Sequence, residues 1–312
     1  MELILDTNIY RNLVSELNHN QTNDLSKKIN ELNVQKNIDI KFPISVAMEL
    51  ISHLEDENEN EKNECKNALT LLVQTSTKII ENEINVNFVP PLNVILGFYF
   101  FNDEKYYLNE YSNVINISQK LVGNTSFEKE ESKSEFIKIV KEELEFEKKE
   151  IKNNIESYFK EINNGKVDWQ YFKNNQKERD IFFKKLNNGK SFLYIAQSFM
   201  IRAFDINRSK FEENEINFKK FKEFINEFAP AIKMFELLLA QIGHGTESLN
   251  NILDKKWNTI IDISILFGFL YNPKKMNRKI VTEDANMRNK VVEFGIHDKI
   301  LNLKELKLLY NI

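Results

Sequence analysis

The stretch Glu2-Leu3-Ile4-Leu5-Asp6-Thr7-Asn8-Ile9 predicts how the chain begins to fold. Its first four residues form a short apolar run that is typical of a strand, and Asp6-Thr7-Asn8 follows as a polar turn. Apolar residues then recur at helical spacing, at Ile9, Leu13, Val14 and Leu17. We therefore expect a strand, a polar turn and then a helix.

Strands and helices also alternate in the segments that follow, and the same pattern returns near the other end of the chain. After a helix over 23–35, residues 38–42 alternate as a strand does and Pro43 ends it. A helix is expected next, with Ser45 as its N-cap. The later part of the chain predicts a buried helix over 257–271, a strand over 279–282, a helix over 286–294 and a last strand over 299–303.

Between these two parts the chain is predicted to be helical. Amphipathic patterns extend from about residue 61 to residue 253, and 8 Gly and 5 Pro in 312 residues leave few turns. Breaks are expected near 89–91, 122–124, 163–165 and 187–189. We therefore expect an α/β domain formed by 1–90 plus 250–312, split by a helical insertion or subdomain over 91–249.

The composition agrees with such a fold. A length of 312 residues suggests about two domains, or one domain with a large elaboration. Hydrophobic residues make up 42% and charged residues 29%, which supplies a packed core and argues against global disorder. The 43 basic and 47 acidic residues give a net charge of −4, so any site for a polyanion must be local.

The cysteine content and the apolar runs indicate the compartment. Cys65 is the single cysteine, so no intrachain disulfide can form, and a reducing compartment is expected. The start of the chain is interrupted by charge too soon for a signal peptide, and the longest near-apolar run, 260–271, contains Asp262. We expect a soluble cytoplasmic protein without a membrane partner.

Four carboxylates lie in apolar surroundings that make an unpaired charge expensive by several kcal/mol. They are Asp6, Glu49, Asp262 and Asp284. Asp6 and Asp284 each end a predicted strand, so a parallel sheet would place both at its carboxyl edge, where open α/β sheets bind ligands. Glu49 and Asp262 belong to predicted helices beside such a sheet.

Each acid also has a simpler interpretation. Asp6 and Asp284 can cap the helices that follow them, and Glu49 alone is typical of a solvated helix face. Asp262 points more strongly to function, because a buried acid in an apolar helix needs a dedicated partner. Together the four favour a site for Mg²⁺ or Mn²⁺, and two such ions about 3.5 to 4 Å apart can drive phosphodiester hydrolysis.

Four segments of the sequence carry a resemblance to a known family. They are Leu5-Asp6-Thr7-Asn8-Ile9, Ile44-Ser45-Val46-Ala47-Met48-Glu49-Leu50, Asp262-Ile263-Ser264-Ile265-Leu266 and Val281-Thr282-Glu283-Asp284. In this order they resemble the motifs of PIN-domain nucleases, and residues 294–303 are similar to that family's last helix and strand. The resemblance covers about the first 90 and the last 60 residues.

The resemblance implies a PIN-like α/β/α sandwich with a central parallel sheet, Mg²⁺ or Mn²⁺ as cofactor, and endonucleolytic cutting of RNA that leaves 5′-phosphate and 3′-hydroxyl ends. Carried over by motif, the four acids would be catalytic metal ligands. Thr282 and Asn8 would orient these acids or the metal-bound water. Glu49 and Asp262 are 213 positions apart, wider than in a compact PIN domain, which bears on substrate and regulation.

Basic residues surround the fourth acid in the sequence. They are Lys274, Lys275, Arg278, Lys279, Arg288 and Lys290. Among them we expect Lys275, Arg278, Lys279 and Arg288 to contact the phosphates of a nucleic acid. The alternative is a solvated loop.

The leading hypothesis is a metal-dependent endoribonuclease that uses a two-metal mechanism at the four carboxylates. The alternatives are a structure-specific DNA nuclease with the same metal site and a catalytically silent module that binds nucleic acid or protein. A toxin or antiviral effector is a further alternative. The expected partner is RNA, with the helical insertion as a surface for a second copy or a regulatory protein.

Overall fold

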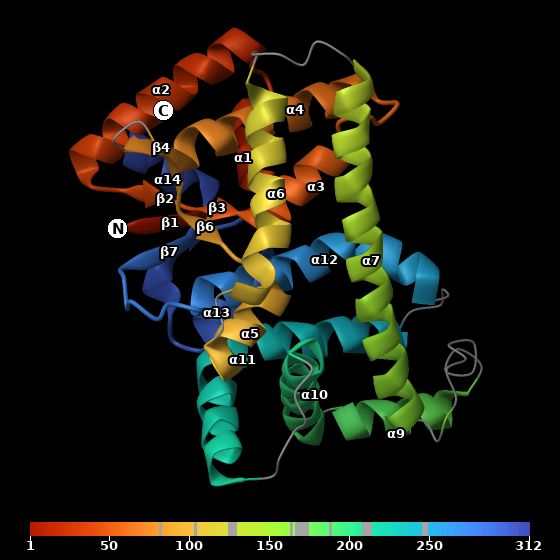
Figure 1. Cartoon of the computed structure of the whole chain (residues 1–312). Coiled ribbons are helices and arrows are strands. Elements are labelled where there is room, and N and C mark those ends of the chain that lie inside the picture. Colours follow the sequence, from red (N-terminus) through yellow and green to blue (C-terminus); the bar gives the residue numbers. More distant parts are fainter. Residues whose placement is uncertain are drawn as a thin grey trace.

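Most of the described chain is helical, with a small parallel sheet near one side (Figure 1). The computed structural model describes residues 1–80, 83–102, 105–123, 130–162, 165, 175–186, 189–207, 214–244 and 249–312. Within these ranges no helix has the length and hydrophobicity needed to cross a bilayer.

The elements follow one another in three stretches. The first contains β1 (Glu2–Leu5), α1 (Thr7–Val14), α2 (His19–Lys36), β2 (Asp39–Ile40), β3 (Phe42–Pro43), α3 (Ile44–Ser52) and α4 (Glu59–Ser76). The second contains β4 (Thr77–Ile80), β5 (Glu83–Val86), β6 (Phe88–Val89), α5 (Leu92–Phe101), α6 (Lys105–Val122), α7 (Glu130–Ile162), α9 (Gln176–Leu186), α10 (Lys190–Ile206) and α11 (Glu215–His244). The third contains α12 (Leu249–Leu270), β7 (Arg278–Val281), α13 (Ala285–Glu293), the 3-10 helix η1 (His297–Lys299), β8 (Ile300–Leu301) and α14 (Leu303–Tyr310).

The main sheet has four parallel strands in the order β2-β1-β7-β8. Its central pair joins β1 to β7, from Glu2 opposite Arg278 to Leu5 opposite Val281. The first and last parts of the chain therefore build one sheet, as the sequence predicts. The protein has a mixed α/β fold, and because the strands run parallel, their carboxyl ends share one edge.

The hydrophobic core runs without a break from the sheet into the helices. Leu3, Ile4 and Ile280 of the central strands are fully buried, and α12 packs against α3, α5, α7 and α11. In Figure 1, α12 crosses between the sheet and the long helix α7. The division into 1–90 plus 250–312 and 91–249 stays a prediction, because the same core spans both parts.

Several expected elements differ in detail. Ser45 is not an N-cap, because α3 already begins at Ile44, after Pro43, whose extended backbone and missing N–H suit a helix start. The Ser45 hydroxyl instead lies 3.2 Å from that of Ser264 on α12. The strand expected over 38–42 is split, since β2 pairs with β1 while β3 pairs with β6.

The stretch over 61–253, expected to be mainly helical, contains a hairpin outside the insertion predicted over 91–249. Strands β4 and β5 pair antiparallel, from Thr77 opposite Val86 to Ile80 opposite Glu83. Alternating β-branched residues in 77–86 favour strands over helix. The expected breaks near 89–91 and 122–124 agree with the ends of β6 and α6, whereas 124, 163–164 and 187–188 lie outside the described residues.

Candidate functional site

Asp6 lies at the end of β1 and caps α1. Its Oδ1 accepts a hydrogen bond from the backbone N–H of Ile9 at 2.8 Å, and its own N–H donates to the carbonyl of Val281 at 3.1 Å. The residue is 1% exposed, and within the described part of the chain its Oδ2 has no hydrogen-bond partner at bonding distance. One oxygen of Asp6 therefore serves the helix, and the other is left for a ligand.

Thr282 and Asp284 follow β7 on the neighbouring strand. The Thr282 hydroxyl is fully buried and accepts a hydrogen bond from the Asp284 N–H at 2.9 Å. Asp284 caps α13 by accepting from the N–H of Met287 at 2.6 Å. The Thr282 hydroxyl also acts on Asp6, where it lowers the pKa. Thr282 thus connects the acids at the ends of the two central strands.

Glu49 and Asp262 come from the two helices that contact each other beside this edge. Glu49 on α3 is 6% exposed and accepts a hydrogen bond from the Thr7 hydroxyl. Asp262 on α12 is partly exposed, although Ile261 and Ile263 on either side of it are buried. The apolar surroundings predicted for Asp262 are therefore present.

The pKa values of Asp6 and Asp262 respond to the charges of the other acids. Burial is the largest cause of the rise in the pKa of Asp6 to about 6, and the charges of Glu49 and Asp284 contribute to that rise. Burial also raises the pKa of Asp262 to about 8, with added repulsion from Asp284, Asp6 and Glu49. Burial raises the pKa of Glu49, which Thr7 partly offsets. The structure therefore brings all four predicted acids into one region.

The donor set of this region fits a hard divalent cation. All four side chains offer carboxylate oxygens, the ligands that Mg²⁺ prefers, and the buried Oδ2 of Asp6 is open. Among the described residues, no three of these acids have ligand oxygens within 4.8 Å of one another. Mutual repulsion of the carboxylates favours such a spacing.

A second group of ligand atoms lies at the end of α3. Within the described residues, His53, Asp56 and Glu61 place one ligand atom each within 4.8 Å of the others. The group is partly exposed, and its members already form pairs: His53 Nδ1 lies 2.5 Å from Asp56, and Glu61 lies 3.4 Å from Arg11. These pairs account for the arrangement without an ion.

Thr7 was not singled out by the sequence, although it lies inside the quoted turn. Its hydroxyl links the first turn of α1 to Glu49 on α3, across 42 positions of sequence. A polar residue between a strand end and a helix was the available signal. Asn8, the next residue, is exposed on α1.

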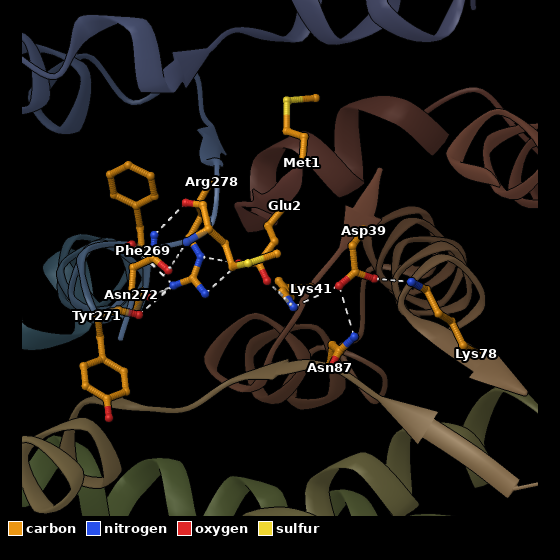
Figure 2. Close-up of polar contacts among 12 residues, drawn as sticks. Met1, Glu2, Asp39, Lys41, Lys78, Asn87, Phe269, Tyr271, Asn272 and Arg278 are labelled. Atoms are coloured by element: carbon orange, nitrogen blue, oxygen red, sulfur yellow. Dashed lines mark hydrogen bonds and ion pairs between the residues drawn. The ribbon is translucent and has the colours of Figure 1, made fainter. Parts of the chain in front are cut away.

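The basic residues are placed differently from the prediction. Arg278 begins β7, so it lies at the amino edge of the sheet, where it donates to Glu2 at 2.8 Å and to the carbonyl of Tyr271 at 2.7 Å (Figure 2). Lys275 precedes the strand, and Lys279 is its second residue. A strand rises about 3.3 Å per residue, which separates these three from the acids at the other edge. Arg288 on α13 lies on the side of the acids, 3.9 Å from Glu283.

Comparisons with known proteins do not add to this site. No family model, curated protein or solved structure matches the chain.

Proposed function

We propose that this protein is a metal-dependent, PIN-like endoribonuclease that hydrolyses RNA phosphodiester bonds at Asp6, Glu49, Asp262 and Asp284. The observation that supports it is the meeting of four acids, from two strand ends and two helices, where burial and repulsion between acids raise the pKa of Asp6 and of Asp262. A module that only binds a partner has no need of so many costly buried charges. The carboxyl edge of a parallel sheet is also where such folds bind ligands.

The four acids would hold Mg²⁺ or Mn²⁺. When bound, the metal supplies positive charge that activates a water and stabilises the leaving oxygen in phosphodiester hydrolysis. Asp6 presents Oδ2, because its Oδ1 is fixed by the N–H of Ile9. Hydroxyl groups orient the acids, with Thr7 donating to Glu49 and Thr282 acting on Asp6.

The positions of Asp284 and Asn8 also bear on this proposal. Asp284 is held in place by its cap on α13 and by the bond from its N–H to Thr282. Asn8 is exposed on α1, two residues after Asp6, and offers an amide that can orient a water or a phosphate oxygen. Neither role requires Asn8 or Asp284 to move a proton.

The experiment compares cleavage of labelled RNA by the wild type and by Asp262→Asn in Mn²⁺ or Mg²⁺. The substitution keeps the shape of the side chain and removes its charge, and we expect cleavage to fall by about 100-fold or more. Glu283→Gln is the matched control, because Glu283 adjoins Asp284 but is exposed. Its cleavage rate should stay within about twofold of the wild type.

Two outcomes would contradict the proposal. Asp262→Asn cutting at the wild-type rate would exclude this mechanism, provided that circular dichroism shows both proteins folded. Equal losses in Asp262→Asn and Glu283→Gln would point to damaged folding rather than lost chemistry. Single-stranded DNA and DNA flaps in the same assay separate an RNA substrate from a DNA substrate.

A further inference from the structure

The amino edge of the sheet, opposite the four acids, contains a pocket. Its volume is about 220 Å³, and its lining includes Glu2, Lys41, Lys274 and Arg278 together with the rings of Phe98 and Tyr271. We call it the amino-edge pocket. Figure 2 shows the polar contacts along it, with Glu2 between Lys41 and Arg278.

The charges around this pocket do not cancel. Glu2 pairs with Lys41 and with Arg278 at 2.7 Å each, and Asp39 pairs with Lys41 at 2.9 Å and with Lys78 at 2.5 Å. Lys274 also lines the pocket and forms no ion pair with any residue that the structure describes. Four cations against two anions leave an excess of two positive charges, which attracts an anion.

Hydrogen-bond donors remain available on side chains that are firmly held. Lys41 has three N–H groups and directs two of them at Glu2 and Asp39. Arg278 uses Nε and one Nη2 proton on Glu2, and uses Nη1 on the carbonyls of Gly268 and Tyr271 at 3.0 and 2.7 Å. By this count each side chain keeps one N–H that makes no hydrogen bond to the residues that the structure describes. Because their other bonds fix them, little conformational freedom is lost on binding.

An aromatic pair lies beside these donors. The rings of Phe98 and Tyr271 are stacked, with centroids 6.3 Å apart and an interplanar angle of 24°. The two residues come from α5 and from the residue after α12, so packing between helices holds them. A planar base can stack on such a surface, and nearby cations can hold its phosphate.

We propose that the amino-edge pocket binds one nucleotide unit, with the base against Phe98 and Tyr271 and the phosphate at Lys41, Lys274 and Arg278. The volume lies below the roughly 300 Å³ at which pockets for drug-sized ligands begin, so it limits the occupant to a single unit with one base and one phosphate. The unit belongs either to a free nucleotide or to an RNA strand, and both offer the same chemistry. The proposal does not depend on the nuclease proposal, because this pocket lies at the other edge of the sheet.

The test measures the binding of adenosine monophosphate and of hexaadenylate to the full chain by calorimetry in EDTA. Lys274→Glu reverses an exposed charge in the pocket, and we expect both affinities to fall about tenfold. Lys275→Glu is the matched control, because Lys275 is the exposed neighbour that does not line the pocket. Its affinity should remain within about twofold of the wild type.

Two further measurements test where the base binds and which kind of molecule occupies the pocket. Tyr271→Leu removes one stacking ring and should weaken adenosine monophosphate about tenfold, with a thermal melt confirming that the variant is folded. Tighter binding of hexaadenylate than of the mononucleotide, with the same dependence on Lys274, identifies an RNA strand. Equal affinities for the two probes identify a free nucleotide.

Three results would overturn the proposal: no binding of either probe, equal losses in Lys274→Glu and Lys275→Glu, or binding lost in Asp262→Asn but kept in Lys274→Glu. The last result would place the nucleotide at the four acids instead. Loss of cleavage in Asp262→Asn with unchanged binding in EDTA separates the two proposals. Each can therefore fail without the other.

Discussion

Buried carboxylates at the two edges of the parallel sheet have pKa shifts in opposite directions. At the amino edge, burial alone would raise the pKa of Glu2, but bonds and charges from Lys41 and Arg278 outweigh it and lower the pKa. At the carboxyl edge, burial and, to a smaller extent, the charges of neighbouring acids raise the pKa of Asp6 to about 6 and that of Asp262 to about 8. Burial acts to raise the pKa of the acids at both edges, so the charges of the neighbouring side chains decide whether the net pKa shift is upward or downward.

This difference separates acids that are paired with cations from acids that are not. Glu2 ties β1 to β7 and, through Lys41, to the segment that joins β2 to β3. Asp6 and Asp262 form no ion pair with any residue in the described ranges. Buried acids that lack a cation are typical of sites that bind one, whereas the paired Glu2 holds its two cations in place.

The largest expected effect tests this contrast through stability. Glu2→Gln leaves Lys41 and Arg278 without their shared anion, so the free energy of unfolding should fall by about 3 to 5 kcal/mol. Asp262→Asn removes a carboxyl group whose raised pKa disfavours the folded state at neutral pH, so it should raise the free energy of unfolding. Urea denaturation in EDTA measures both, and changes of the same sign would contradict the contrast.

A slightly smaller effect concerns metal binding. Mn²⁺ at about 100 times its dissociation constant should raise the free energy of unfolding by about 2.7 kcal/mol, because it binds only the folded state. The increase should disappear in Asp262→Asn and persist in Lys274→Glu, whose altered residue lies at the other edge. An increase that survives in Asp262→Asn would place the ion elsewhere, for example at His53, Asp56 and Glu61.

The pH dependence of stability sharpens the comparison at the amino edge. Lys78 and Lys41 offset the effect of burial and bring the pKa of Asp39 below 3.8, and the pKa of Glu2 lies below 4.5. A lowered pKa favours the charged form in the fold, so this stabilisation is present above about pH 4.5 and is lost as the pH falls through the lowered values. Denaturation from pH 7 to pH 3 should show Asp39→Asn approaching the wild type at low pH. If the difference in the free energy of unfolding between Asp39→Asn and the wild type stays constant with pH, the lowered pKa of Asp39 is contradicted.

The smallest effect concerns Arg288. Its contact with Glu283 is long, at 3.9 Å, and both side chains are more than a third exposed, so Arg288→Ala should change the free energy of unfolding by less than about 0.5 kcal/mol. If it contacts phosphate, the KM for RNA should rise severalfold while kcat is unchanged. An unchanged KM would show that Arg288 does not contact the RNA.

The sequence predicts local features of this protein better than distant ones. The strand, turn and helix around Asp6 and Asp284 are local patterns, and the structure has them where expected. Arg278 was placed beside Asp284 because the two are close in sequence, but an extended strand carries them to opposite edges. The ion pair of Arg278 with Glu2 joins residues 276 positions apart, which no local pattern reveals.

Glu49 and Asp262 show an intermediate case. Their apolar neighbours indicate burial, yet only the packing of α3 on α12 brings the two helices into contact. The hydroxyl that holds Glu49 comes from Thr7 on a third element. Single residues therefore predicted that these positions carry buried acids. The orientation of the acids could not be predicted, because it depends on contacts between elements that are distant in the sequence.

The pairing of β1 with β7 also sets when the protein can work during its synthesis. Residue 281 leaves the ribosome long after residue 5, and at about 5 to 20 residues per second those 276 positions take roughly 14 to 55 s. Throughout this time β1 has no β7 to pair with, and Asp6 has neither Thr282 nor Asp284 beside it. A nascent chain therefore carries an incomplete site, and a hydrolytic activity located there would begin only after the ribosome has finished the strand that completes it.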